Sequence, residues 1–101
     1  MRGRRSGSTI RNNIASILLY TGESYGYDIY KTYTKVFGKV HIRSIYYNLK
    51  KGALDGEFVV HEIRKERGDY TWGSESERVY YALGPNANAK SLSDKEVRKI
   101  A

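Results

Sequence analysis

The chain has 101 residues, of which 40% are hydrophobic and 13% aromatic, so it can bury one modest core and has no room for two domains. Its formal charge of +7 and pI near 9.7 predict attraction to a polyanion, and DNA, RNA and an anionic membrane all fit that description. The absence of cysteine excludes disulfides and cysteine-ligated metal sites, and it favours a cytoplasmic location.

A basic arm is predicted at residues 1–7, where glycine and serine surround Arg2, Arg4 and Arg5. A segment this polar cannot be buried, so we expect it to be flexible when free. Short arms of this kind can follow phosphates or the minor groove, and the alternative is a solubilising tail. The apolar run at residues 14–20 is too short to span a bilayer, so no membrane partner is expected.

Two helices are predicted between this arm and Gly38. Ser8 or Thr9 can cap the first helix, which should end around residues 20–22 and is interpreted as core scaffold. Its apolar positions recur at helical spacing: Ile10, Ile14, Ile17 and Leu18. A turn ending in Gly26 leads to the second helix, which Gly38 terminates. The apolar side of this helix carries Ile29, Tyr30, Tyr33 and Phe37.

The third predicted helix, over residues 41–52, has two chemically different faces. One face is apolar and should be buried: Ile42, Ile45, Tyr46 and Leu49. The other face can form hydrogen bonds, stack and neutralise phosphate: Ser44, Tyr47, Asn48 and Lys51. That mixture suits a helix lying in a DNA major groove, and the alternative is an ordinary solvated helix face.

Two strand-like runs within residues 58–83 predict a β-hairpin whose polar loop has glycines at both ends. In the second run Val79, Tyr81 and Leu83 point to one side, which should pack on the helices. Helices followed by such a hairpin predict an α+β fold, a winged helix-turn-helix with three helices and a two-stranded wing over residues 8–86.

The tail over residues 87–101 should contain one more short helix. Pro85 ends the preceding strand, and Ser93 with Glu96 has the spacing of a capping box.

Three segments resemble the PadR-like winged-helix transcriptional regulators, in the order that this family shows. ILLYTGESYGYDIYKTYTKVFG is similar to the family's first two helices, RSIYYNLKKGALDGEF to its third helix and the following strand, and ERVYYALGPNA to its tyrosine-rich final strand. The resemblance covers roughly residues 14–86. Arg43 stands where the family has glycine and Tyr47 where it has proline, so the start of the helix and its base contacts are expected to differ.

The resemblance implies that Arg43, Ser44, Tyr47 and Asn48 approach DNA while Tyr46 packs inside. Asn48 is the best candidate for a base contact, because an amide can pair with adenine through two hydrogen bonds. Tyr47 can stack on a sugar or touch a thymine methyl group, whereas Arg43 and Lys51 suit phosphate. The resemblance also implies a homodimer, although the short tail departs from the long C-terminal helices that usually form it.

The predicted wing carries Arg64, Lys65 and Arg67 beside the loop GDYTWGSES, and neighbouring acidic residues dilute this positive charge. Trp72 is the unusual member of the loop. An exposed tryptophan can wedge against a nucleic-acid backbone or stack on an unpaired base. The alternative is that it folds back and covers apolar surface of the hairpin.

No motif of an enzyme is found: there is no glycine-rich nucleotide loop, no paired-histidine zinc motif and no cysteine nucleophile. His41 and His61 could join Asp55 or Glu57 in a metal site, but we interpret both histidines as structural. No catalytic residue, cofactor or metal is therefore expected.

These observations predict a sequence-specific DNA-binding transcriptional regulator, with residues 41–52 in the major groove of double-stranded DNA and the hairpin over residues 58–83 on the backbone. Two alternatives stay open. One is an RNA- or ribosome-associated winged-helix protein, since winged helices also serve structured RNA. The other is a protein-interaction module of a transcription or translation assembly.

Overall fold

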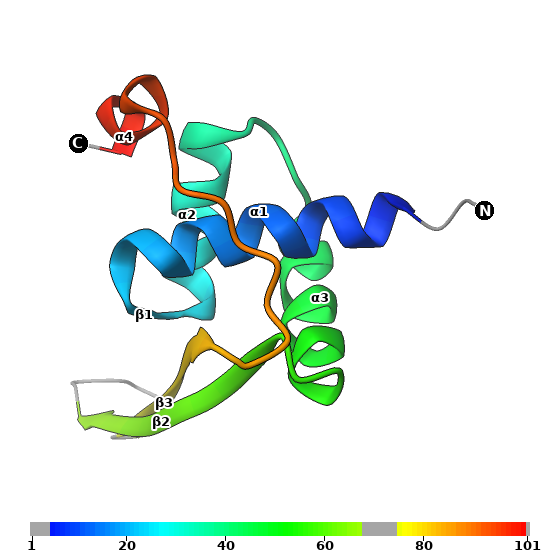
Figure 1. The fold of residues 1–101 in the computed structure, drawn as a ribbon. Helices are drawn as coiled ribbons and strands as arrows, with labels where there is room; N and C mark the ends of the chain where they lie inside the picture. The colour runs from blue at the N-terminus through cyan, green and yellow to red at the C-terminus, as the bar shows by residue number, and fades with distance from the viewer. Residues whose placement is uncertain (1–4, 68–74, 101) are drawn as a thin grey trace.

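The computed structural model describes residues 5–67 and 75–100, including the side chains of residues 9–63 and 78–100. Its elements in chain order are α1 (Arg5–Thr21), β1 (Glu23–Tyr25), α2 (Gly26–Val36), α3 (Ile42–Leu54), β2 (Phe58–Arg67), β3 (Glu75–Leu83) and α4 (Asp94–Ile100). Figure 1 shows α1 crossing the middle of the molecule, with α3 beneath one half of it and the β2–β3 hairpin projecting below. The α+β arrangement of helices and hairpin is the winged helix-turn-helix predicted from the sequence.

The core lies where α1, α2 and α3 meet the base of the hairpin. Its fully buried side chains come from each of these elements: Ile14, Ile17, Leu18, Ile29, Ile45, Leu49 and Phe58. Removing a side chain of this size from water stabilises the fold by roughly 1.5–3 kcal/mol. The apolar spacing of the first helix, and Ile45 and Leu49 of the third, therefore predicted residues that hold the helices together. Ile42, also predicted to be buried, is half-buried.

Apart from the N-terminus, the predicted helix limits agree with the structure to within about two residues, and α3 ends at Leu54 rather than near residue 52. α1 begins at Arg5, before the predicted start near Ser8, so the end of the expected flexible arm is helical instead. α2 stops at Val36, where the backbone N–H of Phe37 donates to the Tyr33 carbonyl. Gly38 follows with a φ of 103°, a left-handed conformation that glycine adopts without strain, and this confirms its predicted role as helix terminator.

The sheet has three strands in the order β1-β3-β2, so the prediction of a two-stranded wing was incomplete. β1 pairs antiparallel with β3, with Glu23 opposite Ala82 and Tyr25 opposite Tyr80. From its sequence this segment is predicted to be a turn, because a strand of three residues is too short to show an alternating pattern.

The pairing of β2 with β3 contains a β-bulge at His61. Val60 lies opposite Tyr81 and Glu62 lies opposite Tyr80, so His61 is an extra residue in its strand. Below the bulge, Phe58 lies opposite Leu83, and Tyr81 and Leu83 pack against the core as predicted. The bulge interrupts the alternation of side chains along β2 at His61.

The segment after β3 runs back across α1 before it reaches α4, as Figure 1 shows. The backbone N–H of Lys90 donates to the Ser16 hydroxyl at 3.4 Å, which ties this segment to α1. The predicted capping box is confirmed: the Ser93 N–H donates to Glu96 Oε1 at 2.8 Å and the Glu96 N–H donates to Ser93 Oγ at 3.2 Å. Within the described part of the chain, no helix combines the length and the apolar character needed to cross a membrane.

Candidate nucleic-acid interface

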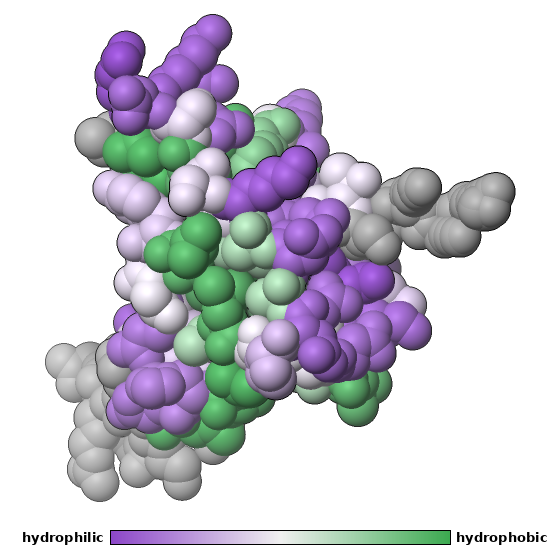
Figure 2. Space-filling view, in the orientation of Figure 1, coloured by the Kyte–Doolittle hydropathy of each residue, from purple (hydrophilic) through white to green (hydrophobic). Residues whose placement is uncertain are grey.

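The outward face of α3 carries polar, aromatic and charged side chains that point to solvent. Ile45 and Leu49 anchor its inner side in the core, and they leave Tyr47 62% exposed on the opposite side. Arg43 and Lys51 are exposed beside it, and Ser44 is half-buried. In Figure 2, hydrophilic residues dominate the side where α3 and the first half of α1 lie, while a hydrophobic band crosses the middle of the molecule. A rigid helix thus presents an aromatic ring and cations to solvent.

The N-terminal end of α3 is suited to an anion. His41 precedes the helix in an extended conformation, and among the described residues its side chain makes no capping hydrogen bond. Its carbonyl accepts the N–H groups of Ser44 and Ile45, at 2.9 and 3.4 Å. The first N–H groups of a helix have no partner within the helix, and they carry the positive end of its dipole. Together with the Arg43 side chain they can bind a phosphate group.

Asn48, predicted to contact a base, is instead buried, with only 3% of its surface exposed. Its Oδ1 accepts a hydrogen bond from Arg11 Nη1 at 3.2 Å, and its Nδ2 donates to the Ser44 carbonyl at 2.8 Å. Because both ends of the amide are already engaged inside the protein, Asn48 cannot pair with adenine in this conformation. The assignment of a base contact to Asn48 is therefore wrong for this structure.

Arg11 also forms an ion pair with Glu57, with 3.2 Å between Arg11 Nε and Glu57 Oε2. Since Arg11 belongs to α1, Asn48 to α3 and Glu57 directly precedes β2, one guanidinium connects the first helix, the third helix and the base of the hairpin. The sequence did not point to Arg11, and it suggested Glu57 only as a possible metal ligand and not as the partner of Arg11. Only the fold brings them to Asn48, which lies 37 residues from Arg11.

Tyr46 was expected to pack inside, but its surface is 43% exposed. Its ring lies against Gly26 at the start of α2, so closely that a Cβ atom at Gly26 would overlap Cε1 of Tyr46. Tyr46 therefore lies at the border of the core, with one side of the ring covered by α2. This contact helps to set the distance between α2 and α3.

A cleft between α3 and the hairpin brings two further cations close to the outward face of α3. Lys50 and Arg78 line it together with Tyr25, Tyr46 and Tyr81. The guanidinium of Arg78 lies over the Tyr25 ring, 4.6 Å from its centre. Burial raises the pKa of Tyr81, so its hydroxyl stays protonated and can donate a hydrogen bond. The cleft therefore offers positive charge and a hydrogen-bond donor between the helix and the wing.

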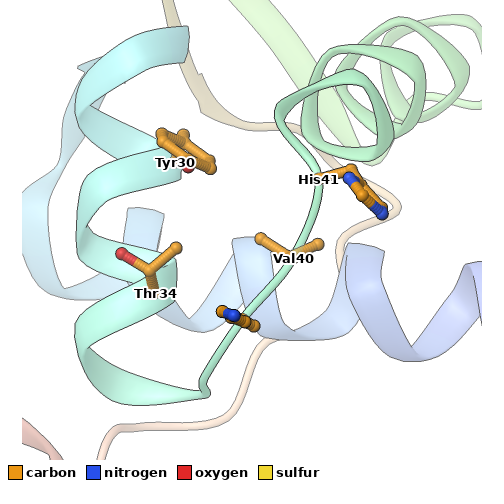
Figure 3. A pocket seen from close by; sticks show the side chains of 5 residues that line it. Tyr30, Thr34, Val40 and His41 are labelled. Atoms are coloured by element: carbon orange, nitrogen blue, oxygen red, sulfur yellow. The ribbon is translucent and has the colours of Figure 1, made fainter.

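Figure 3 shows a second hollow, of about 300 Å³, between α2 and the connection to α3. Tyr30 and Thr34 of α2 face Val40 and His41 across it, and Lys39 completes the lining. The Thr34 hydroxyl already donates to the Lys31 carbonyl at 2.8 Å. The hollow is a surface groove next to the start of α3.

Several predicted contact residues cannot be placed. Arg2, Arg4 and Trp72 lie outside the described residues. Arg5 opens α1, and Arg64, Lys65 and Arg67 belong to β2, but the positions of their side chains are not described. Their contacts with nucleic acid stay predictions.

By sequence, the chain matches no protein-family model and no curated protein. Its structure is similar to that of Bacillus subtilis PadR in complex with operator DNA, with a TM-score of 0.55 and 21% sequence identity. The match covers 91% of this chain and 44% of the PadR chain, so this chain spans less than half the length of that protein. The similarity shows that the chain has a PadR-like winged-helix fold, which confirms the fold implied by the resemblance.

Proposed function

We propose that this protein is a DNA-binding transcriptional regulator, in which α3 enters the major groove and the β2–β3 hairpin contacts the DNA backbone. The main observation is the outward face of α3, which exposes Arg43, Tyr47 and Lys51 while the opposite side of the helix is fixed in the core. The structural similarity to PadR bound to operator DNA supports the choice of DNA as partner.

The roles of the α3 residues follow from their exposure and chemistry. Tyr47 is the most exposed aromatic residue on this helix, so it takes over the base-reading role first assigned to Asn48, through contact with a thymine methyl group. Arg43 and Ser44 bind phosphate at the helix start, and Lys51 binds phosphate about two turns later. Asn48 and Arg11 hold the helix in its orientation.

The remaining predicted contacts surround this helix in the proposal. Arg64, Lys65, Arg67 and Trp72 belong to the wing, and Arg2, Arg4 and Arg5 belong to the N-terminal arm. The cations of the wing bind phosphate, and those of the arm bind phosphate or reach the minor groove, which adds affinity without reading the sequence directly. Trp72 wedges against the nucleic-acid backbone or stacks on an unpaired base.

The first test is a selection of bound sequences from random double-stranded DNA, followed by fluorescence-anisotropy titration of the selected site, a scrambled site and a structured RNA. We expect a defined consensus and tighter binding to the selected site than to the scrambled one. Tighter binding to RNA, without any preference between the two DNA sequences, would reject the proposal in favour of an RNA-associated protein. Binding that disappears at moderate salt and shows no sequence preference would favour the protein-interaction module.

The second test separates base reading from phosphate binding within α3. Tyr47→Ala should remove most of the roughly 1–3 kcal/mol penalty that a mismatch at its base pair carries. Lys51→Ala should weaken all sites similarly and reduce the slope of log K against log salt by about one. Lys95→Ala, at an exposed position in α4, is the matched control and should change neither quantity. Equal effects of the two α3 substitutions would contradict this division of roles.

A further inference from the structure

We propose that Glu23, His61 and Glu62 form a binding site for a divalent transition-metal ion such as Zn²⁺. One possible ligand atom from each side chain can be chosen so that the three atoms all lie within 4.8 Å of one another. An imidazole with two carboxylates is a ligand set that zinc accepts, and three protein ligands leave a coordination position for water. This inference is independent of DNA binding.

The sheet brings these residues together from strands that are not neighbours. Glu23 in β1 lies opposite Ala82 in β3, and Glu62 in β2 lies opposite Tyr80, two residues earlier in β3. Residues opposite one another in an antiparallel pair share a face, so Glu23 and Glu62 stand on the same face of the sheet, on either side of β3. The small side chain of Ala82 leaves space between them.

The β-bulge supplies the third ligand. Without the extra residue in β2, strict alternation would turn His61 to the face opposite to that of Glu62. A bulge re-aims a side chain in its strand, and here the imidazole reaches Glu23. The bulge therefore places two successive side chains of β2, those of His61 and Glu62, close to the same ion, which regular pairing could not do.

The distances suit a shared ion. Nε2 of His61 lies 3.2 Å from Oε1 of Glu23. Two ligands bound to one tetrahedral zinc at 2.0–2.1 Å are separated by about 3.3 Å, so this pair needs almost no movement. Oε1 of Glu23 is shielded from solvent, which favours a positive charge beside it. The His61 side chain is 55% exposed, so an ion can reach the site from water.

The structure does not support the pairing considered from sequence, in which the histidines would join Asp55 or Glu57. Glu57 is engaged with Arg11, and His41 lies at the start of α3. The metal would instead link β1, which immediately precedes α2, to the wing strand β2. A protonated His61 can alternatively form a plain ion pair with Glu23, and the experiment must separate these two states.

The test is titration of the metal-free protein with ZnCl₂ by isothermal calorimetry, and with Co²⁺ by visible absorption. We expect saturation at one ion per chain and a rise in melting temperature with Zn²⁺. His61→Ala should lower the affinity by at least tenfold and abolish the Co²⁺ band. Glu23→Gln, which preserves the shape of the side chain, should also weaken binding.

His41→Ala is the matched control, because it removes the other histidine of the chain and should leave the binding of both ions unchanged. Circular dichroism of each variant verifies that the fold is retained. Absence of saturable binding to the wild-type protein would overturn the proposal and leave the plain ion pair. The same conclusion follows if His61→Ala and His41→Ala bind Zn²⁺ as tightly as the wild type.

Discussion

Asn48 lies at the border between the core of the protein and its proposed DNA-binding surface. If Asn48 positions Arg11, its substitution lowers the stability of the fold, whereas a base contact would make its substitution change DNA binding. Asn48→Ala would leave Nη1 of Arg11 without its acceptor in a partly buried position, although Nε of Arg11 keeps its ion pair with Glu57. We expect the free energy of unfolding, measured by urea denaturation, to fall by about 1–3 kcal/mol. Tyr47→Ala, at the exposed neighbour, is the control and should change it by less than about 0.5 kcal/mol. Unchanged stability of Asn48→Ala would contradict the positioning role.

The orientation of Asn48 and of Tyr46 could not be obtained from helical spacing. Spacing places Asn48 with Ser44 and Lys51, and it places Tyr46 with Ile45 and Leu49, but both lie near the edges of their faces. Arg11, which is far away in the sequence, supplies the polar partner that allows Asn48 to be buried. Gly26, in another helix, supplies the surface on which Tyr46 rests. For a residue at the edge of a helix face, tertiary contacts thus decide whether its side chain is buried or exposed.

Gly52 and Gly26 each lie against an aromatic ring, but we expect them to differ in how well they tolerate substitution by alanine. A Cβ atom at Gly52 would overlap the Phe58 ring, which is fully buried and cannot move aside. Gly52→Ala should therefore cost about 1–3 kcal/mol in the free energy of unfolding. Gly26→Ala meets the half-exposed Tyr46, which can swing outward, so it should cost less than about 1 kcal/mol. Urea denaturation of both variants measures this difference, and equal losses would argue against it.

At the scale of elements, the sequence predicted every described helix and both long strands. The helices contain a capping signal or a repeated apolar spacing, and the two strand-like runs flank a polar loop with glycines at both ends. It did not predict β1, whose three residues are held in the sheet by pairing with β3 rather than by their own pattern. It also could not place the bulge at His61, since a bulge is defined by the register of two strands. The candidate metal site depends on both of these features, and so it was not visible in the sequence.

The capping box of α4 predicts a local effect. No residue of α4 is fully buried, so the helix depends strongly on its cap. Ser93→Ala removes the acceptor for the Glu96 N–H and should destabilise α4 by about 0.5–2 kcal/mol. Hydrogen exchange should accelerate in the amides of α4 and not in α1 or α3. Ser91→Ala, at an exposed position outside the helix, is the control, and matching exchange in both variants would contradict the role of the cap.

At the scale of the whole molecule, basic residues occur both on the proposed DNA-binding side and at the opposite end, in α4. Figure 1 places α4 at the end of the molecule away from α3 and the hairpin. The sequence gives the net charge of +7 but not its distribution, since lysines and arginines occur in α4 as well as in the predicted arm and wing. Net charge alone therefore predicts a polyanionic partner, and the fold decides which cations face it.

Two triple substitutions with the same change in net charge can test that distribution. Replacing Arg2, Arg4 and Arg5 by Gln should reduce the slope of log K against log salt for the selected DNA by up to about 2.7, because each lost phosphate contact accounts for about 0.9. Replacing Lys95, Arg98 and Lys99 by Gln in α4 should leave the slope unchanged, since these exposed side chains lie away from the proposed interface. The slopes are measured by fluorescence anisotropy over a salt series, after circular dichroism has shown that both variants are folded. Equal reductions in the two variants would mean that DNA responds to the overall charge of the protein and not to a defined face, and the proposed docking of α3 would then lose its support.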